Sequence, residues 1–561
     1  MDWKTRWEHW KQNAGDAAIR AETEKLTPEQ AKERFTTNLE FGTGGMRGVL
    51  GAGTARMNVY TVRKATKGFA DYIMAAGPEA MNAGVAISHD NRRMSREFTM
   101  EAAGVLAANG IRAWVFDSLR PTPELSFAVR ELKCFGGIMI TASHNPPQYN
   151  GYKLYDDTGC QLVPEMSDKV TEFIGRVEDE LAVKSLDRAA AGDLIRDIPA
   201  SMDEAYYRAV LAIQLDGGGD KSKLRVVFSP QHGTANVPVR EVLKRLGYDL
   251  VAVEEQAWPD PEFSNTKNPN PEDRAAFDLP VKKAQECGAD IVITTDPDAD
   301  RLGVAVLHNG KYEFLSGNQS GAVLLEYILS QRKAQGTLPA NGIVINTIVT
   351  SDLGDRISRA YGMAVEKTLT GFKFIGDRIR AYERSGEFTY VFGYEESYGY
   401  LVSPIARDKD AIQAVLMCCE AAAFYKMQGK TLKDVLDEIF EKYGYFIEGQ
   451  LAITLEGAKG TERIAGIMKT LRADPPKELA GLKVSVYEDY QSSIRISGGG
   501  EGAIALPKTD ALKYILSDGS WAAVRPSGTE PKCKFYFCAQ GSSMAEAEAR
   551  LEDMKGYFRQ F

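Results

Sequence analysis

The chain has 561 residues, several times the length of an ordinary domain, so we expect about three to five domains with separate cores. Its 68 Lys and Arg residues and 77 Asp and Glu residues give a net charge of −9, which makes the chain a poor candidate for binding nucleic acid through a general electrostatic footprint. No stretch of about 18 uninterrupted apolar residues occurs, so the sequence predicts no membrane span.

The N-terminal segment, MDWKTRWEHWKQ, is charged and lacks the apolar core of a signal peptide. The 7 cysteines are scattered without a CxxC pair, which fits reduced thiols rather than disulfides or a zinc site. These features predict a cytoplasmic protein with no membrane partner.

The first 35 residues have the pattern of amphipathic helices. Trp3, Trp7 and Trp10 are spaced i, i+4 and i+7, which places them on one face of a helix. The segment from Thr27 to Gln30 has a Thr N-cap, a Pro at the first helical position and a Gln that closes a capping box. We expect the tryptophan face to dock against the body of the protein rather than to bind a ligand.

After these helices, short apolar runs rich in β-branched residues alternate with polar loops and helix-like stretches. The runs are GVAIS (84–88), GIMIT (137–141), RVVFS (225–229), DIVIT (290–294) and GIVIN (342–346). Continuous apolar strands that alternate with helices predict parallel α/β sheets covered on both faces. Ligands of such sheets bind beyond the carboxyl ends of the strands, which is where the polar loops fall.

Loops rich in Gly, Pro or Asn divide the chain into segments. They include residues 217–220, 259–272 and 498–502. We place breaks near residues 205, 317 and 447, which predicts four domains. Their ranges are 1–205, 206–316, 317–447 and 448–561.

Asp296, Asp298 and Asp300 alternate in the loop DPDADR, directly after the predicted strand DIVIT. Three carboxylates so close together would repel one another strongly unless a cation lay among them. An EF-hand is excluded, because Arg301 and Leu307 stand where that loop needs Gly and Glu and because a strand precedes the loop. An acidic surface turn is the bland alternative. We favour a hard-cation site, with Mg²⁺ completed by a phosphate.

Ser143 lies in the loop TASHNPP after the predicted buried strand GIMIT, which presents its side chain outwards. A serine hydrolase is disfavoured, because the GxSxG elbow is missing and we expect the adjacent His144 to be poorly placed to take the serine proton. Two interpretations stay open: an Asn-Pro turn in which the serine caps backbone amides, and a serine that carries phosphate. A phosphoserine would add acceptor oxygens that complete a Mg²⁺ shell.

Three further loops have residues suited to a phosphorylated ligand. RPSGTEP (525–531) offers a guanidinium fork, hydroxyls and backbone amides, which suit a phosphate cradle, although Ser-Gly turns are common. GYEESYG (393–399) places a carboxylate and a hydroxyl two residues apart, as sugar hydroxyls require, and is otherwise an ordinary loop. GTGGMRG (42–48) lets backbone approach a ligand but lacks nucleotide-binding spacings.

Together and in this order, these loops resemble those of one family, the α-D-phosphohexomutases. TASHNP is similar to the family's phosphoserine loop, DPDADR to its Mg²⁺ loop, GYEES to its sugar-recognition loop and RPSGTE to its phosphate-binding loop. The resemblance covers nearly the whole chain. FGTGGMRG and the length resemble the long phosphoglucomutase branch, which includes phosphopentomutases and glucose 1,6-bisphosphate synthases. The family fold implied is three related α/β domains with mixed or parallel sheets and a C-terminal α+β domain, around a central cleft.

The resemblance also implies roles for individual residues. Ser143 would be the phosphorylated nucleophile, and its phosphate would join Asp296, Asp298 and Asp300 around Mg²⁺. The other residues implied in catalysis are His144, Lys153, Arg47 and Lys409. Those implied in substrate binding are Arg301, Thr370, Gly371, Glu395, Ser397, Arg525, Ser527, Gly528 and Thr529. The chain departs from the family pattern at Ala299, where many members have Gly, and at Tyr394, which is inserted relative to the commoner GEES.

The activity implied is that of an isomerase, a phosphoglucomutase that interconverts glucose 1-phosphate and glucose 6-phosphate. Phosphorylated Ser143 would convert a sugar monophosphate to glucose 1,6-bisphosphate, which would turn over and return its other phosphoryl group; added bisphosphate would act as an activator. Phosphomannomutase, phosphopentomutase or glucose 1,6-bisphosphate synthase activity is the alternative. Two rivals are a metal-dependent phosphatase and a non-catalytic sugar-phosphate sensor; the presence of Ser143 and all three Asp residues argues against the sensor. We expect a monomer or a homodimer.

Overall fold

The computed structural model of the chain describes residues 1–42, 44–216, 218–454, 457–526 and 532–561. These residues form two compact units. The first contains residues 1–316, 372–393 and 397–431, and the second contains residues 317–371, 394–396 and 432–561. Within the described ranges, no helix combines the length and the apolar character that crossing a membrane requires.

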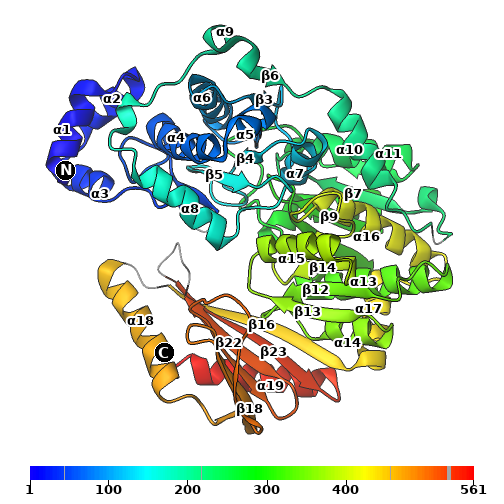
Figure 1. Cartoon of the computed structure of the whole chain (residues 1–561). Helices are drawn as coiled ribbons and strands as arrows, with labels where there is room; N and C mark the ends of the chain where they lie inside the picture. Colours follow the sequence, from blue (N-terminus) through cyan, green and yellow to red (C-terminus); the bar gives the residue numbers. More distant parts are fainter. Residues whose placement is uncertain (43, 217, 455–456, 527–531) are drawn as a thin grey trace. The chain divides into compact units, whose positions relative to one another are not determined.

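Three helices open the first unit, drawn in blue in Figure 1. They are α1 (Trp3–Asn13), α2 (Ala17–Lys25) and α3 (Pro28–Phe35). Trp10 is fully buried, with the rings of Phe35 and Tyr60 edge-on at 5.4 and 5.2 Å between centroids, and Trp3 and Trp7 pack against the same core. The predicted docking face is therefore confirmed, as is the capping box, in which Thr27 and Gln30 exchange hydrogen bonds of 3.3 and 3.0 Å.

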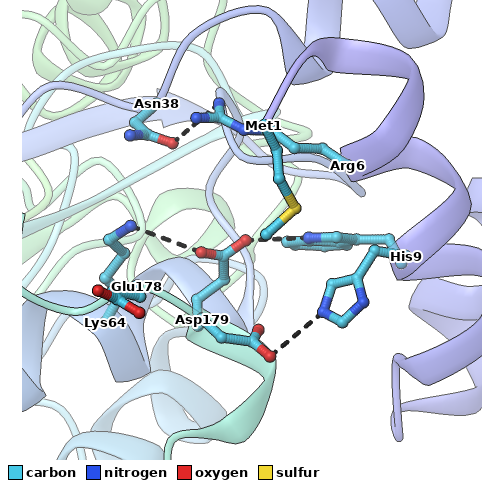
Figure 2. A pocket seen from close by; sticks show the side chains of 9 residues that line it. Met1, Arg6, His9, Asn38, Lys64, Glu178 and Asp179 are labelled. Atoms are coloured by element: carbon cyan, nitrogen blue, oxygen red, sulfur yellow. Dashed lines mark hydrogen bonds and ion pairs between the residues drawn. The ribbon is translucent and has the colours of Figure 1, made fainter.

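A polar cavity of about 80 Å³ lies beside α1, between it and the segment 178–180 (Figure 2). His9 lies 3.2 Å from Asp179, and Glu180 lies 3.5 Å from the Lys64 ammonium and accepts a hydrogen bond of 3.0 Å from the Trp10 indole. Figure 2 shows the His9 ring facing the Asp179 carboxylate. These polar contacts therefore attach α1 to the rest of the unit.

The first sheet has six strands in the order β1-β5-β4-β2-β3-β6. β4, β2, β3 and β6 are parallel, whereas β1 and β5 form an antiparallel edge. The strands are β1 (Gly45–Val49), β2 (Val85–His89), β3 (Ala113–Val115), β4 (Gly136–Ile140), β5 (Tyr149–Tyr155) and β6 (Ile195–Asp197). The helices of this region are α4 (Val59–Ala76), α5 (Pro78–Ala83), α6 (Ser95–Ala108), α7 (Thr122–Glu131), α8 (Pro164–Gly175), α9 (Arg188–Ala191) and α10 (Ser201–Leu211). Every residue of β2 and β4 is buried, as the uninterrupted apolar runs predicted.

The second sheet has five strands in the order β11-β10-β9-β7-β8, parallel at β9, β7 and β8 and antiparallel at the edge formed by β10 and β11. The strands are β7 (Arg225–Ser229), β8 (Asp249–Ala252), β9 (Ile291–Thr295), β10 (Leu302–His308) and β11 (Lys311–Leu315), and the helices are α11 (Asn236–Arg245) and α12 (Asp278–Cys287). Short 3₁₀ turns cover residues 180–182, 192–194, 221–223, 254–256 and 274–277.

Four later elements complete the first unit. They are α15 (Phe372–Ser385), β14 (Thr389–Glu395, whose last two residues belong to the second unit), β15 (Gly399–Leu401) and α16 (Ala411–Lys426). α16 is apolar on almost every side and nearly all of its residues are buried, which is the pattern of a helix inside a core. It packs against α10, α11, β9 and β10.

The second unit combines a parallel strand pair with a large antiparallel sheet. The first part contains α13 (Gly317–Ala334), β12 (Gly342–Thr347), α14 (Leu353–Ala360), β13 (Ala364–Thr368) and α17 (Leu432–Tyr443), with β12 and β13 parallel. The sheet contains β16 (Tyr445–Thr454), β17 (Glu478–Leu479), β18 (Leu482–Asp489), β19 (Ile494–Ser497), β20 (Gly500–Ala503), β21 (Leu512–Leu516), β22 (Trp521–Pro526) and β23 (Lys532–Gly541). α18 (Gly457–Ala473) and α19 (Met544–Phe558) pack against this sheet (Figure 1).

These elements confirm the predicted fold class. The two sheets of the first unit are mixed with parallel centres, and the C-terminal sheet is antiparallel with helices packed on it, as an α+β domain requires. The predicted polar loops follow β2, β4, β7 and β9 at their carboxyl ends. The loops of neighbouring strands contact each other, since Asp90 N–H donates to Ile140 O at 3.1 Å and Thr234 N–H donates to Pro297 O at 2.8 Å.

Tyr394, the residue that departs from the family's GEES pattern, is fully buried in the second unit. A Cβ atom added at Gly321 in α13 would lie 2.5 Å from the tyrosine ring, and one added at Gly354 in α14 would lie 2.0 Å from its Oη. The ring is therefore packed against two glycines, and its side chain serves as an anchor for the strand end that carries Glu395.

We predict that Gly354→Ala destabilises the protein, although a helical glycine-to-alanine change ordinarily stabilises by up to about 1 kcal/mol. The added methyl group would overlap Tyr394 Oη, and overpacking of this kind costs about 1–3 kcal/mol. Adding Tyr394→Phe should recover part of the loss, because the nearest remaining atom is then Cζ, 3.0 Å away. The measurement is the Tm of each variant. The control is Gly466→Ala in α18, where no atom lies within 4 Å of the added Cβ and Tm should rise; a similar rise in Gly354→Ala would contradict the packing.

Candidate active site

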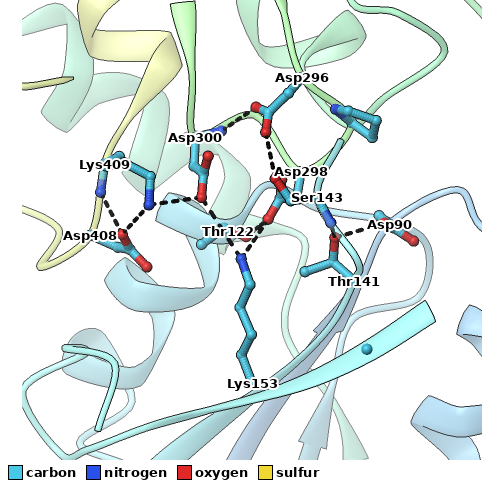
Figure 3. Close-up of polar contacts among 12 residues, drawn as sticks. Asp90, Thr122, Thr141, Ser143, Lys153, Asp296, Asp298, Asp300, Asp408 and Lys409 are labelled. Carbon is cyan, nitrogen blue, oxygen red and sulfur yellow. Dashed lines mark hydrogen bonds and ion pairs between the residues drawn. The ribbon is translucent and has the colours of Figure 1, made fainter. Parts of the chain in front are cut away.

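The centre of the candidate site is a cluster of three buried carboxylates in the loop after β9. One carboxylate oxygen from each of Asp296, Asp298 and Asp300 lies within 4.8 Å of the other two. All three residues are at most 2% exposed. Ser143, from the loop after β4, donates its hydroxyl proton to Asp296 Oδ2 at 2.9 Å (Figure 3). The structure thus brings the two strongest sequence motifs into direct contact.

The carboxylate loop is a tight turn closed on Asp296. Asp296 Oδ1 accepts hydrogen bonds from the backbone N–H groups of Asp300 and Arg301 at 3.0 and 2.9 Å. Ala299 adopts a φ of 58°, a left-handed conformation that glycine adopts without strain. This explains why glycine suits the position and why alanine, the smallest side chain with a Cβ, is a modest departure.

Two lysines from distant segments neutralise the cluster. Lys153 of β5 lies 2.9 Å from Asp298 Oδ2, and Lys409, just before α16, lies 3.0 Å from Asp300 Oδ2 (Figure 3). Burial and the two neighbouring carboxylates raise the pKa of Asp296 well above its ordinary value. Burial acts on Asp298 in the same direction, but the Lys153 ammonium outweighs it and lowers the pKa of Asp298 below its ordinary value. The negative charge of the cluster is therefore favoured on Asp298 and disfavoured on Asp296.

The cluster has the donor set of a hard-cation site. Asp298 Oδ1 and Asp300 Oδ1 are buried and accept no hydrogen bond from the described residues. Buried carboxylate oxygens without a partner are costly, and a cation bound by oxygen ligands would satisfy them. The residues present therefore fit a metal ion.

The Ser143 loop differs from one sequence expectation. Ser143 has a φ of 51°, which turns its Oγ to within 3.2 Å of Nδ1 of the next residue, His144. The expectation that His144 is poorly placed to take the serine proton was therefore wrong, because it ignored this left-handed turn. Burial, together with the Arg301 and Arg47 guanidinium groups, holds the pKa of His144 well below its ordinary value, so its imidazole is neutral.

The remaining predicted residues of the first unit lie around this centre. Arg47 of β1 donates to Asn145 Oδ1 at 2.9 Å, which places its guanidinium against the serine loop. Arg301 forms an ion pair with Glu272, and its Nε lies 3.9 Å from Asp300 Oδ1. Ser397 is half-buried, and the next residue, Tyr398, accepts a hydrogen bond of 3.0 Å from Leu302 N–H at the end of the carboxylate loop.

The other predicted residues belong to the second unit. Glu395 is 4% exposed, and its Oε1 accepts a hydrogen bond of 2.7 Å from Gly371 N–H, which joins two of the predicted sugar-binding segments. Thr370 Oγ1 is buried without a partner among the described residues. Arg525 lies near the end of β22 and is half-buried. Ser527, Gly528 and Thr529 lie outside the described residues, so the predicted phosphate cradle is seen only at its arginine.

Four residues of the site were not assigned a role from the sequence. Thr122 donates to Asp298 Oδ2 at 3.0 Å, and Asp408 lies 3.1 Å from Lys409 Nζ and accepts a hydrogen bond of 2.9 Å from Tyr155. Asp408 neighbours Lys409 in the chain and could have been suspected, whereas the threonine at the start of α7 carries no signal. The others, Asp90 and Arg92, lie in a strand-end loop that the sequence marked only as polar.

Comparison with known proteins places these observations in one family. Residues 38–180, 204–310 and 316–443 match the alpha/beta/alpha domains I, II and III described for phosphoglucomutase/phosphomannomutase, and residues 456–554 match the C-terminal domain. A phosphoglucomutase of Staphylococcus aureus (strain MRSA252) is 39% identical over 533 residues, 94% of each chain.

Solved structures have the same fold. A phosphoglucomutase/phosphomannomutase family protein from Burkholderia thailandensis superimposes with a TM-score of 0.66 at 18% identity, over 93% of this chain and 97% of that chain. The phosphoglucomutase parafusin of Paramecium superimposes with a TM-score of 0.67 at 18% identity, over 93% of this chain and 94% of that chain.

A buried acid lies two residues beyond Thr122 on α7. Glu124 is fully buried, and neither of its carboxyl oxygens has a hydrogen-bond partner among the described residues. Burial raises the pKa of Glu124 well above its ordinary value of 4.5, and the nearby Asp203 carboxylate adds to the shift. The folded protein therefore keeps a proton on Glu124 up to a higher pH than the unfolded chain does.

We predict that Glu124→Gln gains stability relative to the wild type as the pH rises. A raised folded-state pKa contributes stability at low pH that is lost as the pH rises from 4.5 toward the folded-state pKa, by up to about 1.4 kcal/mol per pH unit. Glutamine keeps the shape but does not titrate. The measurement is the difference in Tm between variant and wild type at about pH 5, 6.5 and 8. The exposed Glu79→Gln is the control, and a difference for Glu124→Gln that is constant across the three pH values would contradict the prediction.

Proposed function

Because the chain belongs to the phosphoglucomutase/phosphomannomutase family, we propose that it interconverts glucose 1-phosphate and glucose 6-phosphate, with Ser143 as the phosphorylated nucleophile and glucose 1,6-bisphosphate as the intermediate. The family makes it a mutase, and thus an isomerase. The observation that carries the proposal is the 2.9 Å contact between the Ser143 hydroxyl and Asp296 at the buried carboxylate cluster. A serine held at a candidate metal site suits phosphoryl transfer.

We propose Mg²⁺ as the cation that Asp296, Asp298 and Asp300 hold together with a phosphoryl oxygen on Ser143. When bound there, Mg²⁺ would neutralise charge on the transferring phosphoryl group. Hard oxygen ligands and a phosphate favour Mg²⁺ over softer metals.

The chain's own residues position the transfer and move protons. Ser143 must lose its hydroxyl proton when it accepts a phosphoryl group, and Asp296 Oδ2 at 2.9 Å and His144 Nδ1 at 3.2 Å are within reach of it. Lys153 and Lys409 hold their ammonium groups at the cluster, where a sugar hydroxyl must enter to accept the phosphoryl group. We propose that one of these two lysines exchanges the proton of that hydroxyl and that Arg47 and Arg301 attract the phosphate.

The sugar and its second phosphate would be bound by the other predicted residues. Glu395 and Ser397 would bind sugar hydroxyls, Thr370 and Gly371 would orient the ring, and Arg525 with Ser527, Gly528 and Thr529 would hold the phosphate that is not reacting. A phosphate site separate from the serine lets the bisphosphate exchange its ends, so that either phosphate can return to Ser143. Phosphomannomutase, phosphopentomutase or glucose 1,6-bisphosphate synthase activity is the alternative.

A coupled assay decides among these sugars. Glucose, mannose, ribose and glucosamine 1-phosphates are compared at equal concentration, each with catalytic glucose 1,6-bisphosphate as activator. The highest kcat/KM on glucose 1-phosphate is expected. Release of inorganic phosphate without isomerisation would overturn the proposal in favour of a phosphatase.

We predict that Ser143→Ala and Ser143→Gly both lose mutase activity by roughly 10³-fold or more, because neither can carry the phosphoryl group. Glycine also relieves the strain of the 51° φ, so the pair separates loss of the hydroxyl from loss of the turn. Intact-mass and peptide analysis after incubation with glucose 1,6-bisphosphate should place a phosphate on Ser143 of the wild type only. Activity retained in either variant would refute the nucleophile.

We predict opposite effects of two Asp→Asn changes on stability without metal. Asp296→Asn should keep or raise Tm in EDTA, because it removes one of three clustered like charges, whose burial and mutual repulsion raise the pKa of Asp296. Asp298→Asn should lose about 3 kcal/mol, because Lys153 loses its 2.9 Å partner.

Added Mg²⁺ provides the second readout. It should raise the Tm of the wild type, by the equivalent of about 2.7 kcal/mol at one hundred times Kd, and raise the Tm of both variants less. The measurement is Tm in EDTA and across a Mg²⁺ titration. Equal Tm values for the two variants in EDTA, or a wild type indifferent to Mg²⁺, would count against the assignment.

A further inference from the structure

The backbone of the Ser143 loop is held by one buried arginine. Arg92, in the loop after β2, has a side chain that is fully buried. Its Nη2 donates to the carbonyl oxygens of Ser143 and Asn145, and its Nη1 donates to those of Pro146 and Tyr149 at 2.9 and 3.1 Å. A single guanidinium group therefore contacts four carbonyls along the chain between β4 and β5.

The same arginine is paired with Asp90, which binds the Ser143 loop through the Thr141 side chain. Asp90 Oδ2 lies 3.1 Å from Arg92 Nε and accepts the hydroxyl proton of Thr141 at 2.7 Å. Thr141 Oγ1 in turn accepts the Ser143 N–H at 2.8 Å (Figure 3). The Asp90 carboxylate is itself fixed by Ser95 and by the Arg92 backbone N–H, at 2.8 and 3.0 Å.

Both polar backbone groups of Ser143 are therefore connected to one buried ion pair. The carbonyl is bound by Arg92 directly, and the N–H is bound by Asp90 through Thr141. This matters because Ser143 is a non-glycine residue with a φ of 51°, a conformation that persists only where the surroundings impose it. Relaxation of that φ would turn Oγ away from Asp296.

We propose that Arg92 and Asp90 are positioning residues for phosphoryl transfer, which fix the Ser143 peptide so that its Oγ stays aligned at the carboxylate cluster. The inference rests on the proposed role of Ser143. Arginine suits the task because its planar group offers five donors in a fixed fork, whereas a lysine ammonium cannot reach four carbonyls at once. The hydrogen bonds that connect the pair to the site go to the backbone of the Ser143 loop and to Thr141, so the pair acts through Ser143.

The test compares Arg92→Lys with Arg93→Lys. Arg93 is the next residue, but its side chain is about half exposed and pairs with Glu262. It is therefore a matched control whose ion pair lies outside the Ser143 loop. Arg92→Lys should lower kcat by about 10- to 100-fold while KM for glucose 1-phosphate stays within about threefold, because alignment is lost and ground-state binding is not. Arg93→Lys should match the wild type in both.

The rate of Ser143 phosphorylation is the readout that a purely structural role would not move. Enzyme is mixed with glucose 1,6-bisphosphate, and intact mass is followed over time. Arg92→Lys should acquire phosphate about 10- to 100-fold more slowly than the wild type at the same bisphosphate concentration. A variant that is phosphorylated as fast as the wild type overturns the inference, whereas a wild type that acquires no phosphate on Ser143 overturns the proposed function instead.

A second variant keeps the test decisive if Arg92→Lys does not fold. Thr141→Val keeps the side-chain volume but removes the hydroxyl that binds Ser143 N–H and Asp90. It should also lower kcat and the phosphorylation rate with little change in KM. If both variants fold, their effects should be less than multiplicative in the double variant, because they loosen the same peptide. Wild-type phosphorylation rates in Thr141→Val would overturn the inference.

Discussion

Electrostatic repulsion among three buried carboxylates is the constraint on which the first unit depends. Two unit charges about 4 Å apart repel by about 4 kcal/mol at an effective dielectric constant of about 20, so the cluster around Asp296 needs compensation. The chain supplies it from separate segments: Lys153 from β5, Lys409 from the approach to α16 and Thr122 from the start of α7. The mixed sheets bring these segments to one place, since the loops at the carboxyl ends of their parallel strands meet there.

The loops that meet at the cluster share a second property, which is backbone in the left-handed region. Ser143, Ala299 and Tyr398 have φ values of 51°, 58° and 68° and lie in three loops from three parts of the chain. Each is over-determined by its neighbours: Asp296 closes the turn at Ala299, Tyr398 O accepts Leu302 N–H, and the Arg92–Asp90 pair holds Ser143. Strain at a site of this kind is maintained by hydrogen bonds around it.

Much of the fold could be predicted from local pattern, because its strands are uninterrupted apolar runs and its helices carry ordinary caps. The carboxylate cluster could be predicted equally well, since its three Asp residues alternate within one loop and need no contact between distant segments. The contacts of Thr122 with Asp298 and of Arg92 with the Ser143 loop could not, because they join segments far apart in sequence. The position of His144 was predicted wrongly for a local reason: the positive φ of Ser143 cannot be read from the sequence, because serine seldom adopts it.

Tyr394 looked like an insertion in a sugar loop, and only its packing against Gly321 and Gly354 shows that its ring is an anchor. The domain boundaries near residues 205, 317 and 447 stay predictions.

The first unit is discontinuous in sequence, and this bears on how the protein is made. Residues 1–316 leave the ribosome about a hundred residues before α16, the apolar helix that packs against α10, α11, β9 and β10. Until α16 arrives, the surfaces that it covers are exposed to water and to other chains, a state in which large α/β proteins aggregate. Lys409 immediately precedes α16, so the same event that buries this surface delivers the second lysine to the carboxylates. An assembled site is therefore also a sign that the unit has finished folding, and chains truncated before residue 409 would lack both Lys409 and α16.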